Sequence, residues 1–159
     1  TNDAVGAVPR LVDLGVKTAT IGPALGLIIA QRLVRRLCDD CKQKAEMPKE
    51  EESKIKKFLD KLPSRVDRQN FAKGLNIYKP KGCKSCNNFG FRGRIGIFEF
   101  LEAGSKFEEV ILEEASEVAL KKLGESQGMV KMQEDGILKA LLGITTFEEV
   151  EEITGPIEW

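Results

Sequence analysis

The sequence contains no histidine, so it cannot form a Ser/His/Asp or Cys/His catalytic arrangement. It also lacks a GxxxxGK[ST] phosphate loop. The closest match, "GVKT" at residues 15–18, has an extra Val16 and no upstream glycine. Paired acids such as Glu113 and Glu114 lie among other charges at helical spacing, which is typical of a solvated face. We therefore predict no catalytic and no nucleotide-binding residues in this chain.

Long hydrophobic runs are also missing. The longest uncharged run, residues 18–31, is shorter than the ~20 apolar residues that a membrane-spanning helix needs. Arg10 and Lys17 precede this run, as basic residues precede the apolar part of a signal peptide. However, "QRLVRRL" follows in place of a small-residue cleavage site. The sequence therefore predicts a cytosolic protein.

The formal net charge of zero conceals an uneven distribution of charge. Residues 1–104 contain 20 basic and 12 acidic side chains, whereas residues 105–159 contain 5 and 13. Two solvated faces of one domain would produce this division. A basic half that meets an acidic partner, a neighbouring subunit or nucleic acid would produce it too. The helical spacing of the acids favours the first interpretation. The 159 residues suffice for one ordinary domain or two small units.

The four cysteines form two matched CxxC pairs, Cys38 with Cys41 and Cys83 with Cys86. Two disulfides would need an oxidising compartment, and nothing in the sequence indicates secretion. A redox CxxC motif needs one pair at a helix start in a thioredoxin-like setting, which two pairs match less well. Zinc prefers four soft ligands in a tetrahedron, and each CxxC turn supplies two thiolates. We favour a closed structural zinc site and retain the other two interpretations as alternatives.

The two pairs are separated by 41 residues, compared with roughly 15–20 in simple zinc ribbons. Closing the longer loop costs only ~0.8 kcal/mol more in chain entropy. A structural zinc ion contributes ~10–16 kcal/mol in small peptides. The gap is therefore no physical obstacle, although the insert must have structure of its own. Lys42, Lys81 and Lys84 can offset the negative charge of a zinc tetrathiolate.

Two segments beside the cysteine pairs read as strands. Residues 27–37 are rich in Leu, Ile and Val, although Leu and Arg also favour helices, and a helix here is an alternative. Residues 92–101 are a clearer strand, because Ile95, Ile97 and Phe98 lie in it. If both are strands, they can pair in an antiparallel ladder with the two CxxC turns at the same end. One zinc ion would then hold the two strands in register.

The segments before and between these strands are expected to be mainly helical. Residues 1–15 form one helix, with Asn2 or Asp3 as its cap, a kink at Pro9 and an end at Gly15. Residues 18–26 form a second helix, interrupted by glycine and proline. In the insert, residues 48–62 form an amphipathic helix. Its apolar stripe consists of Ile55, Phe58, Leu59 and Leu62. Residues 76–82 form a short extended run after it.

Four helices are expected in the last third of the chain. They span residues 106–115, 116–128, 130–143 and 145–154. Gly128 and Gly143 end the second and third of them. A capping box opens the fourth, with Thr145 or Thr146 as the cap and Glu148 or Glu149 three residues later. The larger apolar residues of this part are expected to fill the core: Phe107, Met129, Met132 and Phe147.

Four stretches, in this order, resemble one known family: "TNDAVGAVPRLVDLGV", "AQRLVRRLCDDC", "GCKSCNNFGFRGRIGIFE" and "GMVKMQEDGILKALLGITTFEEV". They are similar to the C-terminal end of the ATPases that drive type II secretion and type IV pilus assembly. Only residues 47–76 lack a characteristic motif. The resemblance implies a hexameric, RecA-like motor with a tetracysteine zinc subdomain, onto whose metal ligands Cys38, Cys41, Cys83 and Cys86 fall one by one.

The resemblance also implies an α+β fold with four parts. Residues 1–37 would be the last piece of the RecA-like core, and residues 38–91 the zinc-binding insert. Residues 92–101 would be the returning strand of the hairpin, and residues 102–159 a helical subdomain. The nucleotide-binding motifs of the family would lie upstream of residue 1. We therefore expect a fragment without ATPase activity, in which ATP and Mg²⁺ are bound only by the full-length parent.

Partners and location are implied in the same way. The family suggests a cytoplasmic protein at the periphery of the bacterial inner membrane, in contact with inner-membrane platform proteins and neighbouring subunits of a homohexamer. Arg32, Arg92 and Arg94 are expected in packing or subunit contacts, or as charged strand residues on a solvated face. The alternative function is a free-standing zinc-ribbon module that binds nucleic acid, since "YKPKGCKSCNNFGFRGR" mixes aromatic and basic residues. We consider nucleic acid the less expected partner, because the C-terminal third is acidic.

Overall fold

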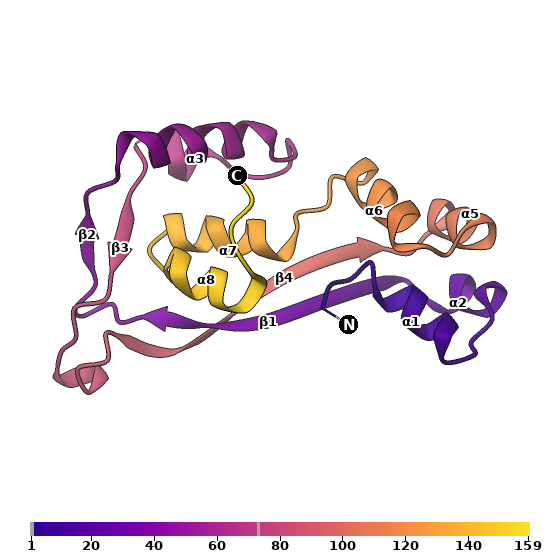
Figure 1. The fold of residues 1–159 in the computed structure, drawn as a ribbon, viewed down its shortest axis with the longest axis horizontal. Helices are drawn as coiled ribbons and strands as arrows, with labels where there is room; N and C mark the ends of the chain where they lie inside the picture. The colour runs from indigo at the N-terminus through magenta and orange to yellow at the C-terminus, as the bar shows by residue number, and fades with distance from the viewer. Residues whose placement is uncertain (1, 73) are drawn as a thin grey trace. The chain divides into compact units, whose positions relative to one another are not determined.

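The structure is a computed structural model that describes residues 2–72 and 74–159, in which helices and strands are mixed (Figure 1). The elements are α1 (Ala7–Asp13), α2 (Thr18–Ala24), β1 (Leu27–Leu37), β2 (Gln43–Ala45), α3 (Lys49–Lys61), α4 (Gln69–Ala72), β3 (Ile77–Lys79), a 3₁₀ turn (Lys84–Cys86), β4 (Phe91–Glu102), α5 (Ser105–Glu113), α6 (Glu117–Ser126), α7 (Met132–Leu141) and α8 (Phe147–Thr154). The prediction of an α+β chain is confirmed.

The long strands β1 and β4 pair with each other, which confirms the strand prediction for residues 27–37 and excludes the helical alternative. They are antiparallel, since Ala103 N donates to Gly26 O at one end (3.1 Å) and Cys38 N to Gly90 O at the other (2.9 Å). β4 is one residue longer at each end than the predicted strand. Both cysteine turns therefore start from the same end of the ladder, as predicted.

A second, short ladder joins β2 to β3. The two strands are antiparallel, with Lys44 opposite Tyr78. The extended run at residues 76–82 was predicted, but its partner strand β2 was not, because three residues of mixed character carry no periodicity. This ladder leads from the first cysteine pair into the insert and back toward the second. It supplies the independent structure that a 41-residue gap requires.

The chain divides into two compact units, each built from two separate stretches. Unit 1 consists of Thr1–Gln31 and Phe98–Lys131, and unit 2 of Arg32–Ile97 and Met132–Trp159. Each unit therefore contains one part of β1 and one part of β4. The four-part division expected from the sequence follows different boundaries, and it stays a prediction.

Each unit has its own hydrophobic core. In unit 1, Phe107, Ile111 and Leu120 are buried together with residues of the N-terminal helices and of both strands. In unit 2, the predicted stripe of α3 is buried against α7, and its members are Ile55, Phe58, Leu59 and Leu62. The Trp159 ring closes this cluster, with edge-on contacts to Phe58 (6.3 Å between centroids) and Phe147 (5.7 Å). Met132 is buried, and Met129 is partly buried against the core of unit 1, as expected.

The first helix differs from its prediction. The helix begins at Ala7. Asp3 stabilises the turn before it, because its carboxylate accepts a hydrogen bond from Gly6 N (2.9 Å). Pro9 is the third residue of this helix, where a backbone N–H has no intrahelical acceptor. The expected kink at Pro9 is therefore wrong. Gly15 ends the segment in a left-handed conformation (φ 87°), as predicted. Thr1, at the start of the predicted helix, lies outside the described residues.

The helix ends in the last third follow the predicted pattern, with one change. Thr146 caps α8 and accepts from Glu149 N (3.4 Å). In a capping box the Glu149 carboxylate would accept from the backbone N–H of Thr146. Here it accepts from Arg35 instead. Gly128 (φ 67°) and Gly143 (φ 68°) lie just beyond α6 and α7 in left-handed conformations.

Replacing Gly143 by alanine is expected to lower the free energy of unfolding by about 1–2 kcal/mol. Its φ of 68° disfavours a side chain, and an added Cβ would lie 2.7 Å from the Tyr78 ring. Gly15→Ala is the matched control, since Gly15 also follows a helix with a positive φ (87°) but has no atom within 4 Å of an added Cβ. Urea denaturation of both variants separates the cost of the positive φ from the cost of the clash with Tyr78. Equal losses would show that Tyr78 makes no contribution.

Candidate metal centre

The first cysteine pair lies directly after β1. Cys38 continues the strand and donates its backbone N–H to Gly90 O, which fixes the loop on β4. A tight turn follows, in which Cys41 N and Lys42 N both donate to Cys38 O (3.2 and 2.9 Å). Both sulfur-bearing side chains are buried. The turn therefore directs two thiols to the same side of the hairpin end.

The second pair lies in a loop between β3 and β4, and its backbone depends on two glycines. Gly82 (φ 96°) passes so close to the returning chain that an added Cβ would lie 2.6 Å from Asn88 O. At Gly90 (φ 75°), an added Cβ would lie 2.3 Å from Pro80 Cβ. Residues 80–82 and 88–90 therefore lie side by side. This arrangement folds the loop, which we call the second cysteine loop (residues 80–90), back onto itself.

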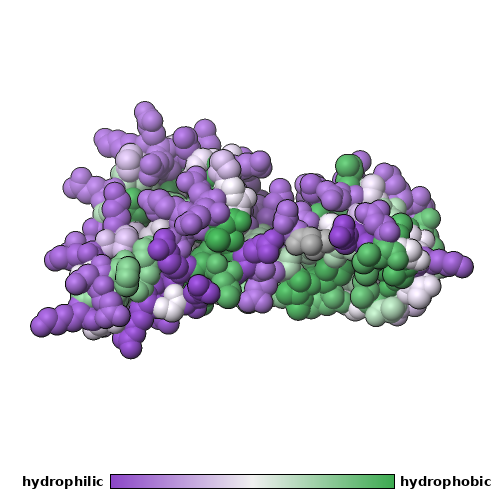
Figure 2. Space-filling model, turned by 60° about the horizontal axis from the view of Figure 1, so that its bottom comes forward, coloured by the Kyte–Doolittle hydropathy of each residue, from purple (hydrophilic) through white to green (hydrophobic). Residues whose placement is uncertain are grey.

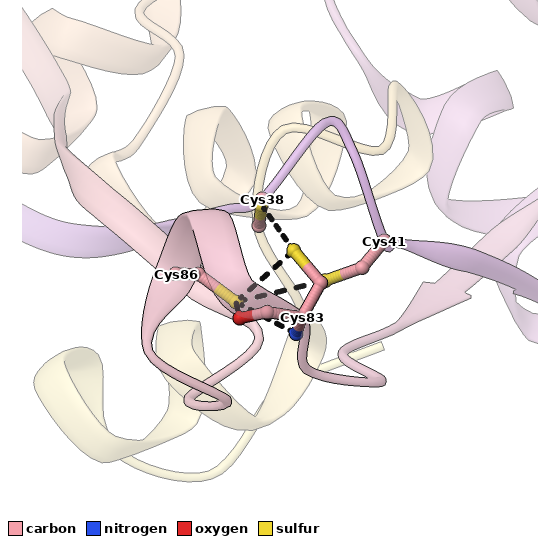
Figure 3. Close-up of side chains that lie close together, drawn as sticks. All are labelled: Cys38, Cys41, Cys83 and Cys86. Atoms are coloured by element: carbon pink, nitrogen blue, oxygen red, sulfur yellow. Dashed lines mark hydrogen bonds between the residues drawn. The ribbon is translucent and has the colours of Figure 1, made fainter.

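The four sulfurs converge at the base of the hairpin (Figure 3). The Sγ–Sγ distances are 3.8 Å for Cys38–Cys83, 3.8 Å for Cys41–Cys86 and 3.7 Å for Cys83–Cys86. All four sulfurs lie within 4.8 Å of one another. A tetrahedron with metal–sulfur bonds of about 2.3 Å has edges of about 3.8 Å. The cluster therefore has the dimensions of a tetrahedral metal site.

These distances do not match either alternative use of the cysteines. A disulfide joins two sulfurs at about 2.05 Å, and all four thiols are free. A redox CxxC motif uses one pair at a helix start, whereas here two pairs face each other across the hairpin end. The sulfur positions instead suit the arrangement that the sequence favoured, in which both CxxC pairs bind one metal ion.

The surroundings of the sulfurs differ in polarity. Burial raises the pKa of the Cys38 thiol to about 12 and also raises that of Cys41. Burial opposes ionisation of Cys86 too. However, the backbone N–H groups of Cys83 and Gly90 donate to its sulfur (3.2 Å each) and lower its pKa to about 6. Cys86 therefore forms a thiolate more readily than Cys38 or Cys41.

The donor set fits a soft cation in a closed site. All four donors are sulfur, three of the four cysteines are buried, and two backbone N–H groups already stabilise the charge on one sulfur. Among the described residues, no histidine or carboxylate joins this group of ligand atoms. Such a site would hold a metal ion structurally and would leave no position for a reacting water.

A cluster of interactions around Arg35 was not predicted from the sequence. Glu149 is almost fully buried, and its carboxylate accepts from the Arg35 backbone N (3.1 Å), from Nε (2.8 Å) and from the guanidinium Nη2. The Arg35 guanidinium also lies over the Phe91 ring, 4.5 Å from its centroid. Thr145 donates its hydroxyl to Arg35 O (2.8 Å). This cluster fixes the start of α8 to the end of the hairpin that carries the cysteines.

The three arginines that the sequence analysis selected are all on the surface of the two long strands. Arg32 lies on β1, and Arg92 and Arg94 lie on β4, all three with exposed side chains. Arg92 lines a small polar cavity beside Cys38, together with Arg36, Asp39 and Asp40. The expectation that they form packing or subunit contacts stays a prediction.

Comparison with known proteins identifies the class to which the chain belongs. The family described as "Type II/IV secretion system protein" matches residues 1–152. The chain belongs to this family, which confirms the resemblance noted in the sequence. In the described residues, every helix is too short or too polar to serve as a membrane span.

Individual relatives narrow the comparison. The chain is 39% identical over 154 residues to the type II secretion system ATPase E of Vibrio cholerae, covering 97% of this chain and 28% of the relative. It is 33% identical over 154 residues to the type IV pilus assembly ATPase PilB of Pseudomonas aeruginosa, covering 97% and 25%. A PilB of Thermus thermophilus is 36% identical over 150 residues, covering 94% and 16%. The chain therefore spans about a quarter or less of the length of these relatives.

Proposed function

We propose that this chain is a zinc-stabilised part of a hexameric, RecA-like motor ATPase that powers protein export or pilus assembly. The observation that carries the proposal is the convergence of four sulfurs, at tetrahedral spacing, on the base of a long hairpin in a member of this family. In the proposal, the metal ties the insert to the strands from which it departs. Movement of the motor could then reach the insert without the loop unfolding.

We propose that Cys38, Cys41, Cys83 and Cys86 hold a zinc ion. Four thiolates in a tetrahedron suit zinc, whereas harder cations such as Mg²⁺ and Ca²⁺ take oxygen ligands. When bound, zinc would supply structural cross-linking and no chemistry. The role of the protein is to hold the four sulfurs at the required spacing and to lower the pKa of one thiol in advance.

The motor activity is assigned to a longer parent protein. The curated relatives are named as ATPases, and this chain covers about a quarter of the first two. Its sequence has no phosphate loop. One face of β1 exposes three apolar side chains, those of Leu27, Ile29 and Leu33. Hydrophobic side chains are also visible on the molecular surface in Figure 2. An exposed apolar sheet face of this kind suits a strand pair that belongs to a larger sheet.

The partners and the location follow from this assignment. We infer a cytoplasmic protein at the periphery of the bacterial inner membrane, which contacts platform proteins of the apparatus and neighbouring motor subunits. The zinc-bearing insert is the proposed contact for the platform protein. If the zinc-loaded chain failed to bind the cytoplasmic domain of that protein while the intact ATPase bound it, this contact would have to lie elsewhere.

Metal content and ATPase activity, measured on the same purified chain, test the proposal directly. We expect about one zinc ion per chain by mass spectrometry under native conditions, because the four thiolates form a single site. We expect no ATP turnover above a heat-denatured sample. Measurable turnover would contradict the assignment of catalysis to other parts of a parent protein, and a metal-free but folded chain would contradict the zinc site.

A further inference from the structure

A short segment after α8 has a defined place although it forms no helix or strand. It consists of residues 155–159, which we call the strap, and it runs from the end of α8 toward α3 (Figure 1). Gly155 has a φ of 89° and turns the chain away from the helix, and the ring of Pro156 fixes the following φ. The family match ends at residue 152, so family membership does not account for the strap.

Gln133 of α7 forms hydrogen bonds with the strap backbone. Its amide oxygen accepts from Glu158 N (3.1 Å). Its amide nitrogen lies 3.0–3.1 Å from three acceptors: Thr154 Oγ1, Gly155 O and Pro156 O. The Glu151 carboxylate of α8 also accepts from Ile157 N (3.2 Å). The strap contributes only backbone groups to these hydrogen bonds, so this part of its binding does not depend on its side chains.

Two side chains attach the strap to the core of unit 2. Ile157 and Trp159 pack against the cluster that α3 and α7 form. The Trp159 ring meets Phe58 and Phe147 edge-on, with centroid distances of 6.3 and 5.7 Å. Residues two apart lie on the same side of an extended segment, and Glu158 between them is exposed. The surface of α3, α7 and α8 therefore holds the strap through backbone hydrogen bonds and two apolar side chains.

The strap lies on the surface of unit 2 and is not part of its interior. None of its residues is fully buried: Gly155, Ile157 and Trp159 are half-buried, and Pro156 and Glu158 are exposed. The core beneath it consists of fully covered side chains of the helices, such as Ile55 and Ile137. In the described part of the chain, no ion pair includes a strap residue. The strap can therefore detach while α3 and α7 keep their contacts with each other.

We propose that the surface of α3, α7 and α8 is a peptide-binding site, which the strap occupies and which binds an extended segment of a partner protein when the strap detaches. The strap shows the chemistry of that partner segment, with isoleucine two positions before tryptophan. In peptide recognition, backbone hydrogen bonds provide affinity and pockets for alternate side chains provide specificity. Gln133 supplies the first element, and Phe58 and Phe147 supply the second. A docked strap lowers the apparent affinity for the partner in proportion to its occupancy.

Binding of a synthetic peptide tests this inference directly. The probe is a peptide with the sequence of residues 153–159, labelled with fluorescein at its N-terminus, and its binding is measured by fluorescence anisotropy. The receptor is the full chain with Trp159→Ala, which loosens the strap and leaves Phe58 and Phe147 in place. It should bind the probe at least about tenfold more tightly than the wild type, because burial of the tryptophan ring stabilises the docked strap by at least that factor. A probe with serine in place of tryptophan should bind neither chain.

A variant that keeps the tryptophan tests the backbone contacts. Trp159 is the only tryptophan of the chain, so tryptophan fluorescence reports on the strap alone. In Gln133→Ala the emission should shift to longer wavelength, and acrylamide should quench it more strongly. Added to Trp159→Ala, Gln133→Ala should weaken binding of the probe about tenfold, since it removes at least two hydrogen bonds. Gln43→Ala is the matched control, because Gln43 is exposed on β2 of the same unit, and it should change neither measurement.

Absence of probe binding by the folded, zinc-loaded Trp159→Ala chain would overturn the inference, as would equally tight binding by the wild type. If Trp159→Ala does not fold, unchanged tryptophan emission in Gln133→Ala would overturn it. A wild-type dimer that the probe dissociates would show that the strap occupies a second copy of the chain, contrary to the proposed arrangement. The inference does not rest on the proposed motor function, and none of these measurements uses ATP. Their failure would therefore leave the zinc site and the motor function as they stand.

Discussion

Replacing Cys83 by serine is expected to abolish tight zinc binding and to lower the free energy of unfolding of unit 2 by about 5 kcal/mol or more. The physical reason is that a structural zinc contributes ~10–16 kcal/mol in small zinc-binding peptides, and three thiolates with a hydroxyl retain only part of it. The effect should be local. Hydrogen exchange should accelerate at the amides that donate within the second cysteine loop, those of Asn88, Phe89 and Gly90.

Ser85→Ala is the matched control, since Ser85 is exposed in the same loop. It should leave zinc content and exchange rates unchanged. Chelation of the wild-type chain should reproduce the Cys83→Ser pattern and should leave exchange in the core of unit 1 near its original rates. If unit 2 kept its protection after complete removal of the metal, the backbone hydrogen bonds alone would suffice to hold the loop, and zinc would have no structural role.

Replacing Arg35 by leucine is expected to lower the free energy of unfolding by about 3 kcal/mol. The variant leaves the Glu149 carboxylate buried with only the backbone N–H at residue 35 as donor, and it removes the cation from the Phe91 ring. Arg35 itself is half exposed, which keeps the expected loss below that of a fully buried pair. Arg36→Leu is the control, because its partner Asp39 is exposed and the pair should contribute less than about 1 kcal/mol.

The same pair predicts a dependence on pH. Hydrogen bonds from the Arg35 side chain, opposed by burial and assisted by the Arg35 backbone N–H, hold the pKa of Glu149 below its ordinary value of 4.5. A lowered pKa means that the stabilisation is complete above pH 4.5 and is lost as the pH falls through the lower, folded-state pKa. The stability difference between the wild type and Glu149→Gln, measured by urea denaturation, should therefore shrink below pH 4.5. A difference that stays constant down to pH 2 would contradict this.

The two long strands and most helices could be predicted from the sequence because their signals are local. β1 coincides with the predicted residues 27–37, and Thr146, Gly128 and Gly143 mark helix ends by their own backbone chemistry. The kink at Pro9 was wrong because its effect depends on where the helix begins, and sequence fixes helix starts to within only a few residues.

In the candidate site, too, local features could be predicted and long-range pairs could not. The four cysteines could be assigned to one site because CxxC spacing encodes the direction of both thiols. The Arg35–Glu149 pair could not, since its partners are 114 residues apart and each lies among similar charges. The short strand β2 was also missed, because its pairing with β3 depends on the returning chain and not on its own three residues.

The interleaving of the two units limits how the protein can be divided. Each unit is formed from two stretches, and each is interrupted by part of the other. Any single internal break in the polypeptide therefore separates residues that belong to the same hydrophobic core. Isolating either unit would require joining its two stretches with a new linker. During synthesis on the ribosome, all residues of unit 1 are made before the second stretch of unit 2.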